Sequence, residues 1–212
     1  MERILAKNNE EDVASRVAAF LKQGHVVAAP TDTVYGLVAD ARSDVAIERV
    51  FVIKGRGLEK SLPIFVSSFE MLDDVAFVKD SNVKEFLHKC WPGKVTCVLP
   101  SRGWMPISVR NRGLTIGVRM PDYPLILKIM EKLGGPVTGT SANLSGRNSL
   151  SRAEGVEAEF KHVPFKPDLL IDGGELPESQ PSTVLDCTVW PPKILRRGAV
   201  SEEEIFHYTG YN

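Results

Sequence analysis

Two basic side chains, Lys54 and Arg56, stand one residue apart in the segment KGR at the end of a predicted helix. Lysine offers a compact point charge and arginine a planar fork that grips two oxygens, so the pair suits a phosphate-bearing ligand. Basic residues at a helix end also commonly do no more than complement the helix dipole. The segment alone does not separate these two interpretations.

A second segment, TGTSANLSG at 138–146, is rich in small polar side chains and follows a short apolar run. Hydroxyl and amide groups placed directly after a strand, together with backbone amides, form natural cradles for anions. Ser141 and Asn143 are the candidates here, and a Ser/Asn-rich turn without a ligand is the competing interpretation. The GxxxxGK[ST] spacing of a P-loop is absent.

Further hydroxyl and arginine side chains lie beside predicted strands. The segment PTDTVYGL at 30–37 brings Thr31, Thr33 and Tyr35 together after a strand, which suits either a polar ligand at the mouth of a sheet or a capped turn. Similar positions in GVRMPDYP, PSTVLD and ILRRG are held by Arg119, Ser182 and Arg196. Each of these three is weak evidence by itself, because a strand-end arginine usually points to solvent.

Other catalytic arrangements find no support in the spacing. The four histidines are scattered, without HExxH or another paired spacing, so no protein metal site is expected. A serine hydrolase would need a GxSxG elbow, which is absent. Cys90, Cys97 and Cys187 form no CxxC pair and are interpreted as free core thiols in a reducing compartment.

The composition is that of an ordinary globular protein: 212 residues, 43% hydrophobic and 25% charged. The net charge of −1 argues against a protein that mainly coats nucleic acid, although a local basic cleft stays compatible with it. No apolar run approaches the roughly 20 residues needed to span a bilayer, and the N-terminus lacks the pattern of a signal peptide. We therefore expect a cytoplasmic protein with no membrane contact.

Periodicity predicts helices and strands in mixed order. Helices are expected at 10–23, at 44–54 with Ser43 as N-cap, at 82–90 with Asn82 and Glu85 as a capping box, at 123–133, and after Ser201. Strands are expected at 25–30, 62–67, 95–99, 115–118, 136–140, 169–172, 182–187 and 193–196. The order predicts an α/β fold with one open, twisted, mixed β-sheet flanked by helices. Residues 1–212 are expected to form a single domain, with the polar loop 173–181 as a candidate lid.

In their order and spacing, PTDTVYGL, KGR, WPGKVT, GVRMPD, TSANLSG, PSTVLD and LRRG resemble the segments of the YrdC family, the threonylcarbamoyl-adenylate synthases. They run from residue 30 to residue 198 and centre on the family's KxR…SxN signature. The resemblance implies the short form of the family and a YrdC-like sheet with a large basic concave face. Departures such as Gly57 and Lys94, where prolines are usual, lie outside KxR and SxN.

The resemblance also implies a nucleotidyltransferase that makes threonylcarbamoyl-AMP and pyrophosphate from L-threonine, bicarbonate or CO2, and ATP with Mg²⁺. Downstream transferase proteins would pass the threonylcarbamoyl group to an adenosine of tRNA. The residues then expected to be catalytic and to bind ATP are Lys54, Arg56, Ser141 and Asn143, with Arg119 and Arg196 also on ATP. Those expected to form the threonine pocket are Thr31, Thr33, Tyr35 and Ser182.

Two alternatives stay open. An RNA-binding module for tRNA or double-stranded RNA would bind phosphates without chemistry. Its basic face would combine Lys54 and Arg56 with Arg102, Arg110, Arg112, Arg147, Arg152 and Arg197. A related domain makes carbamoyl-adenylate during hydrogenase maturation, but it normally sits in a much larger protein with zinc-finger segments, which are absent here.

Overall fold

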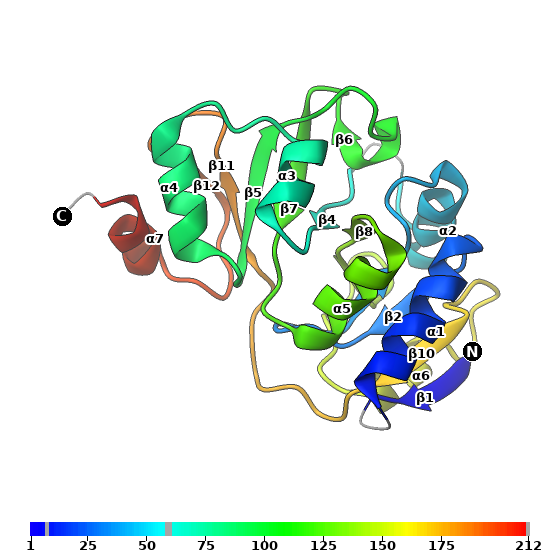
Figure 1. The fold of residues 1–212 in the computed structure, drawn as a ribbon. Helices are drawn as coiled ribbons and strands as arrows, with labels where there is room; N and C mark the ends of the chain where they lie inside the picture. Colours follow the sequence, from blue (N-terminus) through cyan, green and yellow to red (C-terminus); the bar gives the residue numbers. More distant parts are fainter. Residues whose placement is uncertain (7–8, 58–60, 211–212) are drawn as a thin grey trace.

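The computed structural model describes residues 1–6, 9–57 and 61–210, which form two mixed β-sheets with helices on their faces (Figure 1). The five strands of the smaller sheet are, in spatial order, β1 (Glu2–Leu5), β10 (Leu169–Asp172), β2 (Val27–Ala29), β3 (Gly36–Val38) and β9 (Thr140–Ser141). The first three run parallel, while β3 is antiparallel to both of its neighbours. The mixed α/β class is confirmed, with two sheets where one was expected.

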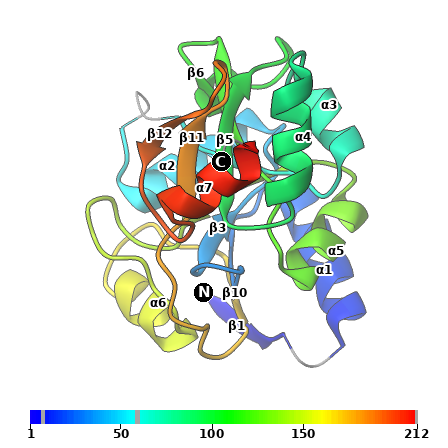
Figure 2. The ribbon, with the colours of Figure 1, turned by 90° about the vertical axis from the view of Figure 1, so that its left-hand side faces the viewer.

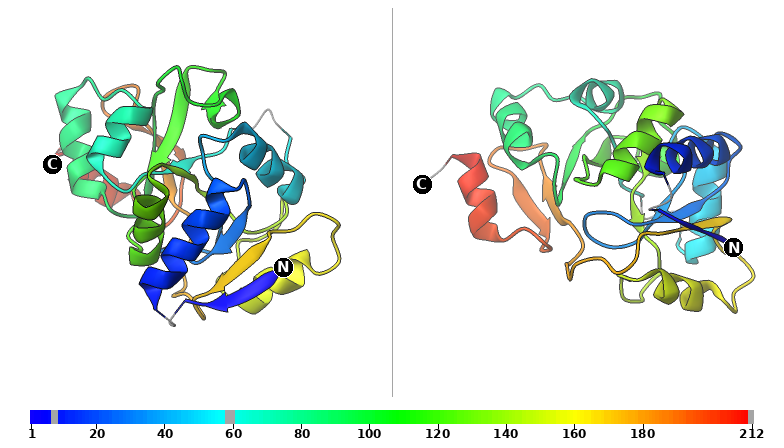
Figure 3. Two further views of the ribbon diagram at one scale, coloured as in Figure 1. Left: turned by 45° about the vertical axis from the view of Figure 1, so that its right-hand side comes forward. Right: turned by 60° about the horizontal axis from the view of Figure 1, so that its bottom comes forward.

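Helices cover both faces of the smaller sheet, as the two views in Figure 3 show. On one face lie α1 (Glu10–Lys22) and α5 (Pro124–Leu133), which pack on each other and on the apolar side chains of β2 and β10. On the other lie α2 (Asp44–Lys54) and α6 (Ala153–Phe160). Strands buried on both faces are apolar throughout, which explains the unbroken runs VVAA and LLI in the sequence.

The larger sheet has the order β12 (Lys193–Arg196), β11 (Thr183–Asp186), β5 (Val95–Pro100), β7 (Thr115–Arg119), β4 (Ile64–Phe65) and β8 (Val137–Thr138), and β6 (Arg110–Asn111) also pairs with β7. Helices α3 (Phe69–Val75) and α4 (Ser81–Cys90) lie over one face, and α7 (Glu202–Thr209) packs on α4 (Figures 1 and 2). A short 3-10 helix, Ile107–Val109, leads into β6. The opposite face stays accessible.

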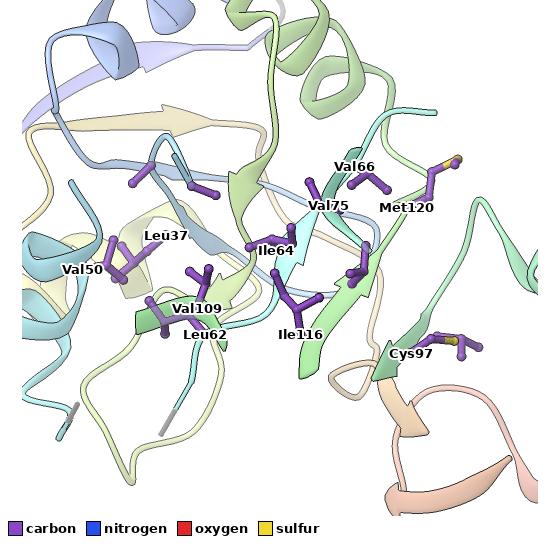
Figure 4. Close-up of a cluster of buried hydrophobic side chains, with 14 of the residues drawn as sticks. Leu37, Val50, Leu62, Ile64, Val66, Val75, Cys97, Val109, Ile116 and Met120 are labelled. Atoms are coloured by element: carbon purple, nitrogen blue, oxygen red, sulfur yellow. The ribbon is translucent and has the colours of Figure 1, made fainter. Parts of the chain in front are cut away.

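Side chains alternate between these two faces of the larger sheet. Cys97, Ile116 and Val118 are fully buried on the helix-covered side. Figure 4 shows this apolar cluster continuing from Cys97 and Ile116 across to Leu37 and Val50, so residues of both sheets contribute to one core. The intervening positions on β5 and β7 must therefore point to the accessible face, where polar side chains can meet a ligand.

The chain passes from one sheet to the other at Gly139, between β8 and β9. A Cβ at this position would collide with the Phe65 ring, so only glycine permits the crossing. The segment that contains β3 and Ala39 also contacts both sheets. Its strand β3 pairs with β9 of the smaller sheet, and Ala39 O accepts from Thr138 N–H of β8 in the larger sheet at 2.9 Å. The TSANLSG and PTDTVYGL segments consequently meet where the two sheets join.

Most predicted elements are confirmed, and their ends follow recognisable chemistry. Ser43 caps α2 and Ser201 caps α7, the latter through a full capping box with Glu204. The capping box expected at Asn82 and Glu85 is wrong: Asp80 caps α4 by accepting from Asn82 N–H, and Glu85 pairs with Lys89 instead. Several short elements were not expected, namely β1, β3, β6, α3, α6 and the 3-10 helix Ile107–Val109.

The three cysteines are buried and free, as expected. Burial raises the pKa of the Cys97 thiol well above its usual range. Among the helices of the described residues, none is long and apolar enough to cross a bilayer.

Candidate functional site

A cavity of about 460 Å³ opens on the accessible face of the larger sheet, next to its junction with the smaller one. All seven polar segments picked out in the sequence contribute to its wall, although they span residues 30–198. Seven of the predicted site residues line this wall, namely Thr31, Thr33, Arg56, Arg119, Ser141, Ser182 and Arg196. The fold thus brings one small-ligand site together from separate strand ends.

The wall is rich in positive charge and hydroxyl groups. Arg56, Arg119 and Arg196 are its basic residues within the described part of the chain. Burial lowers the pKa of Arg196, and its guanidinium donates to Ser182 O at 2.7 Å. Whether the whole concave face is basic stays a prediction, but three arginines around one small cavity suit an anionic ligand.

Arg119 is held rigidly at the end of β7. Its side chain is 3% exposed and forms an ion pair with Asp32, while Nε donates to Gly93 O at 2.8 Å and Nη1 donates to Thr33 Oγ1 at 3.2 Å. Asp32 also accepts from Asp122 N–H at 3.2 Å. Burial lowers the pKa of Arg119, and the Asp32 carboxylate opposes that effect. A buried arginine fixed on three sides keeps its orientation before substrate arrives.

Lys54 lies behind the cavity wall rather than in it. Its ammonium donates to Ser141 O at 2.5 Å and to Asn143 O at 2.8 Å, so the last residue of α2 holds the TSANLSG loop in place. Burial, with help from nearby Arg56, lowers the pKa of Lys54 to about 8. Gly55 ends the helix in the left-handed conformation (φ 58°), which turns the chain so that Arg56 reaches the cavity.

Asn143 and Tyr35 are also absent from the cavity lining. The Asn143 amide nitrogen donates to Leu144 O and Arg147 O, and its oxygen is buried with no partner among the residues that the structure describes. Both side chains lie next to the wall, and their contact with a ligand stays a prediction.

Tyr35 was expected in the threonine pocket but is fully buried. Its hydroxyl donates to Gly174 O at 2.8 Å and accepts from Gly173 N–H at 3.0 Å. Burial raises the pKa of Tyr35 to about 12, so the hydroxyl stays protonated. Tyr35 thus fastens the start of the 173–181 loop, and Leu176 N–H bonds to Ser151 O further along. The lid expected at 173–181 stays a prediction.

Several wall residues were missed by sequence reasoning. Thr96 Oγ1 and Ser182 Oγ share a hydrogen bond of 2.8 Å between the neighbouring strands β5 and β11. Thr96 stands between the apolar residues Val95 and Cys97, so the sequence already indicated that it points to the other face of the strand. Placing it at the site also required knowing which face of the sheet is open. Asp32 lies outside the cavity lining and holds Arg119, a pairing that the sequence alone does not show. The remaining unpredicted wall residues include Pro63, Phe65, Val98, Asn111 and Gly117.

The donor set does not fit a metal held by the protein. Within residues 1–6, 9–57 and 61–210, no group of three or more His, Cys, Asp or Glu side chains is arranged to hold a metal ion. The described part of the cavity wall offers hydroxyl and amide oxygens but no carboxylate. Mg²⁺ prefers carboxylates or substrate phosphates as ligands, so this site would leave it to the phosphates.

Comparison with known proteins agrees with this arrangement. Residues 19–198 match the model of a family named Sua5/YciO/YrdC and described as "Telomere recombination". The chain belongs to the Sua5/YciO/YrdC family. Among curated relatives, it is 39% identical over 196 residues to a threonylcarbamoyl-AMP synthase of Pyrococcus abyssi, covering 92% of this chain and 57% of that protein. It is 33% identical to a Klebsiella pneumoniae threonylcarbamoyl-AMP synthase, covering 85% and 94% of the two chains.

Solved structures of the Sua5/YciO/YrdC family superpose on nearly the whole chain. The crystal structure of P. abyssi Sua5 complexed with L-threonine gives a TM-score of 0.90 at 36% identity, covering 99% of this chain and 61% of that one. The Escherichia coli YciO structure gives 0.84 at 25% identity, covering 96% and 98%. The chain therefore spans little more than half the length of the P. abyssi relative and nearly all of the shorter ones.

Proposed function

We propose that this protein is an L-threonylcarbamoyladenylate synthase. It would join L-threonine, bicarbonate or CO2, and ATP into threonylcarbamoyl-AMP, releasing pyrophosphate. The observation that carries the proposal is that Arg56, Ser141, Arg119 and Ser182 line one cavity together with further hydroxyl-bearing residues. The curated relatives named threonylcarbamoyl-AMP synthase, and the Sua5 complex with L-threonine, support it.

The chemistry asks the protein for position and charge rather than for a nucleophile. The threonine amine forms a bond to the carbon of CO2 and loses a proton, which gives a carbamate. A carbamate oxygen then attacks the α-phosphorus of ATP, and the bond from that phosphorus to the bridging oxygen breaks as pyrophosphate leaves. Because negative charge gathers on phosphoryl oxygens during such transfers, fixed cations that need no reorganisation are the main catalytic resource.

The residues can be assigned to the two halves of this reaction. Arg56 and Ser141, at the junction of the sheets, would hold the phosphates, with Lys54 adding positive charge from behind the loop. Arg119, whose position is fixed by Asp32 and Thr33, would bind the carboxylate or carbamate of threonine. A charge-assisted hydrogen bond in a dry site contributes about 1.5–3 kcal/mol, so two or three of them are enough to place a substrate firmly.

Ser182, Thr31 and Arg196 would complete the enclosure of threonine and nucleotide on opposite sides of the cavity. Mg²⁺ would enter with ATP as part of the substrate, since the described wall provides no carboxylate to hold it. The product would pass to transferase proteins that modify a tRNA adenosine, and the protein would act in the cytoplasm.

The proposal is tested by pyrophosphate release from ATP, measured with and without L-threonine and with and without bicarbonate. Release that requires both, with a product of the mass of threonylcarbamoyl-AMP, is the expected result. ATP hydrolysis that is indifferent to threonine, or no turnover with all three substrates, would reject it.

The RNA-binding alternative is not favoured by the charges. Three of the arginines that would build a basic face are paired with carboxylates: Arg147 with Glu159, Arg152 with Glu175 and Arg197 with Glu202. Paired arginines contribute little net field for phosphates. The hydrogenase-maturation alternative gains nothing from structure, because the HypF chains that superpose are 20% and 19% identical and share the fold alone.

A further inference from the structure

The carboxylate of Glu159 lies in a place that the reaction above does not explain. It belongs to α6, three residues after the buried Val156, and its side chain is only 11% exposed. The other two glutamates of α6, Glu154 and Glu157, are 66% and 41% exposed and pair with Arg3 on the surface. Burying a carboxylate costs free energy unless it is paired or hydrogen-bonded, so the partners of Glu159 indicate what it does.

Both carboxylate oxygens of Glu159 contact the TSANLSG loop or the residue after it. Oε1 accepts from Leu144 N–H at 2.9 Å, and Oε2 accepts from Arg147 Nη1 at 3.2 Å. The Arg147 side chain is 62% exposed, and a surface ion pair of this kind contributes little by itself. The bond to the Leu144 amide is the stronger constraint, because an ionised acceptor there fixes the backbone next to Asn143.

The loop is thus held by two helices that lie on the same face of the smaller sheet (Figure 2). From α2, Lys54 donates to the carbonyls of Ser141 and Asn143, and Lys54 O accepts from Ser145 N–H at 2.9 Å. From α6, Glu159 accepts from the amide between Asn143 and Ser145. A cation on the carbonyls and a carboxylate on the amide restrict the loop, so Ser141 keeps its place on the cavity wall before a ligand arrives.

Glu159 also acts on the charge of Lys54, although neither side chain lines the described part of the cavity. Burial and the nearby Arg56 lower the pKa of Lys54, and the Glu159 carboxylate opposes them. Arg147, the other charged side chain in contact with Glu159, is largely exposed. Removing the carboxylate should therefore lower the pH at which Lys54 loses its proton.

We propose that Glu159 is a positioning residue, which acts with Lys54 to fix the loop that carries Ser141 and so prepares the phosphate side of the cavity for ATP. This inference rests on the proposed function, since it assumes that the phosphates lie at Ser141. Glu159 touches no substrate itself and acts through the Leu144 amide and the Lys54 ammonium. Arg119 is held by other contacts, so the threonine side of the cavity should not respond to changes at Glu159.

The test measures ATP and L-threonine binding by calorimetry on the full chain, across the pH range around 8 in which Lys54 titrates. Glu159→Asp keeps the charge but is one methylene shorter and loses the Leu144 amide, so ATP affinity should fall about tenfold at every pH. Glu159→Gln keeps an oxygen for the amide but loses the charge, so ATP binding should weaken at a lower pH than in wild type. Threonine affinity should stay unchanged in both variants.

The matched control is Glu157→Gln, which removes a carboxylate from the same helix but one that pairs with Arg3. It should leave ATP affinity and its pH dependence unchanged. Unchanged ATP affinity in Glu159→Asp, an unmoved pH dependence in Glu159→Gln, or an equal loss of threonine affinity would overturn the proposal. If Glu159→Asp does not unfold cooperatively in urea, the pH dependence of Glu159→Gln decides alone.

The same measurements separate this proposal from the proposed reaction. Wild-type protein that binds ATP with the expected pattern in the Glu159 variants, but releases no threonine-dependent pyrophosphate, would reject the reaction and leave the role of Glu159 in ATP binding standing. Adenylate formation by wild type, with ATP binding unaffected in both Glu159 variants, would reject the role of Glu159 alone. Absence of ATP binding in wild type would overturn both.

Discussion

Replacing Lys54 by methionine should weaken nucleotide binding strongly while changing the stability of the fold only modestly. The buried ammonium carries a penalty, because a pKa lowered from 10.5 to about 8 corresponds to about 3 kcal/mol on the charged form at neutral pH. Methionine removes that penalty and fills a similar volume. It also leaves the carbonyls of Ser141 and Asn143 without a donor, which costs about 1–3 kcal/mol each. The two effects oppose each other, so the free energy of unfolding should stay within about 3 kcal/mol of wild type.

For nucleotide binding, no favourable effect of Lys54→Met offsets the loss of the ammonium. Without Lys54 the loop that carries Ser141 loses its two ammonium hydrogen bonds, and the phosphates lose a nearby cation. We expect ATP affinity and threonine-dependent pyrophosphate release to fall by about 100-fold or more, which corresponds to ~2.7 kcal/mol. Calorimetric ATP titration and chemical denaturation measure the two quantities separately.

The pH dependence gives Lys54 a second signature. Its pKa is lower in the folded protein than in the unfolded chain, so between about pH 8 and 10.5 the unfolded chain binds more protons. The free energy of unfolding of wild type should therefore gain a rising contribution with pH across this window, absent in Lys54→Met. ATP binding should weaken instead as pH rises through about 8, because the ammonium loses its charge.

The matched control is Lys22→Met, which also removes a basic residue from the last turn of a helix but at an exposed position. If Lys54 did no more than complement the helix dipole, the two variants would behave alike, with small losses of stability and full activity. Wild-type ATP affinity in Lys54→Met would refute the role assigned to the ammonium.

Three further outcomes follow from the contacts around the cavity. Tyr35→Phe removes two hydrogen bonds to the 173–174 backbone, so we expect a loss of about 1–3 kcal/mol in unfolding free energy and a raised KM for threonine with little change in kcat. Asp32→Asn leaves Arg119 buried beside a neutral amide, which should cost about 3–5 kcal/mol in urea unfolding and reduce turnover severely; turnover equal to wild type would remove Asp32 from the site. The buried thiols, with the pKa of Cys97 raised, should not react with a disulfide reagent at pH 8 in the folded protein and should titrate as three after denaturation.

Local chemistry explains which elements the sequence could predict. Helices α1, α2 and α5 combine regular apolar spacing with a cap or a terminal glycine, and their predicted bounds are right to within a residue or two. The strands β3, β8 and β9 are two or three residues long and owe their existence to pairing with distant segments. Strands this short are too short to show a hydrophobic period, so the division into two sheets could not be predicted from the sequence pattern.

The site was predictable by residue type and less so by role. Arginine and hydroxyl side chains near strand ends pointed to Arg56, Arg119 and Ser182, and the structure brings all three together on the cavity wall. Which face of β5 is open depends on where α3 and α4 pack, and that packing is set by the tertiary structure rather than by the local sequence. The position of Thr96 on the cavity wall could therefore not be assigned from the sequence.

The signature KxR…SxN divides, in this fold, into side chains that face the ligand and side chains that hold those in place. Arg56 and Ser141 line the cavity, whereas the side chains of Lys54 and Asn143 donate hydrogen bonds to backbone carbonyls of the TSANLSG loop. The left-handed Gly55 turns the chain between Lys54 and Arg56, so a side chain that supports the wall and one that lines it stand two residues apart. A rigid cradle for a triphosphate requires both kinds, because charge that must reorganise on binding contributes less to the transition state. The signature thus contains both residues that line the cavity and residues that hold those in place.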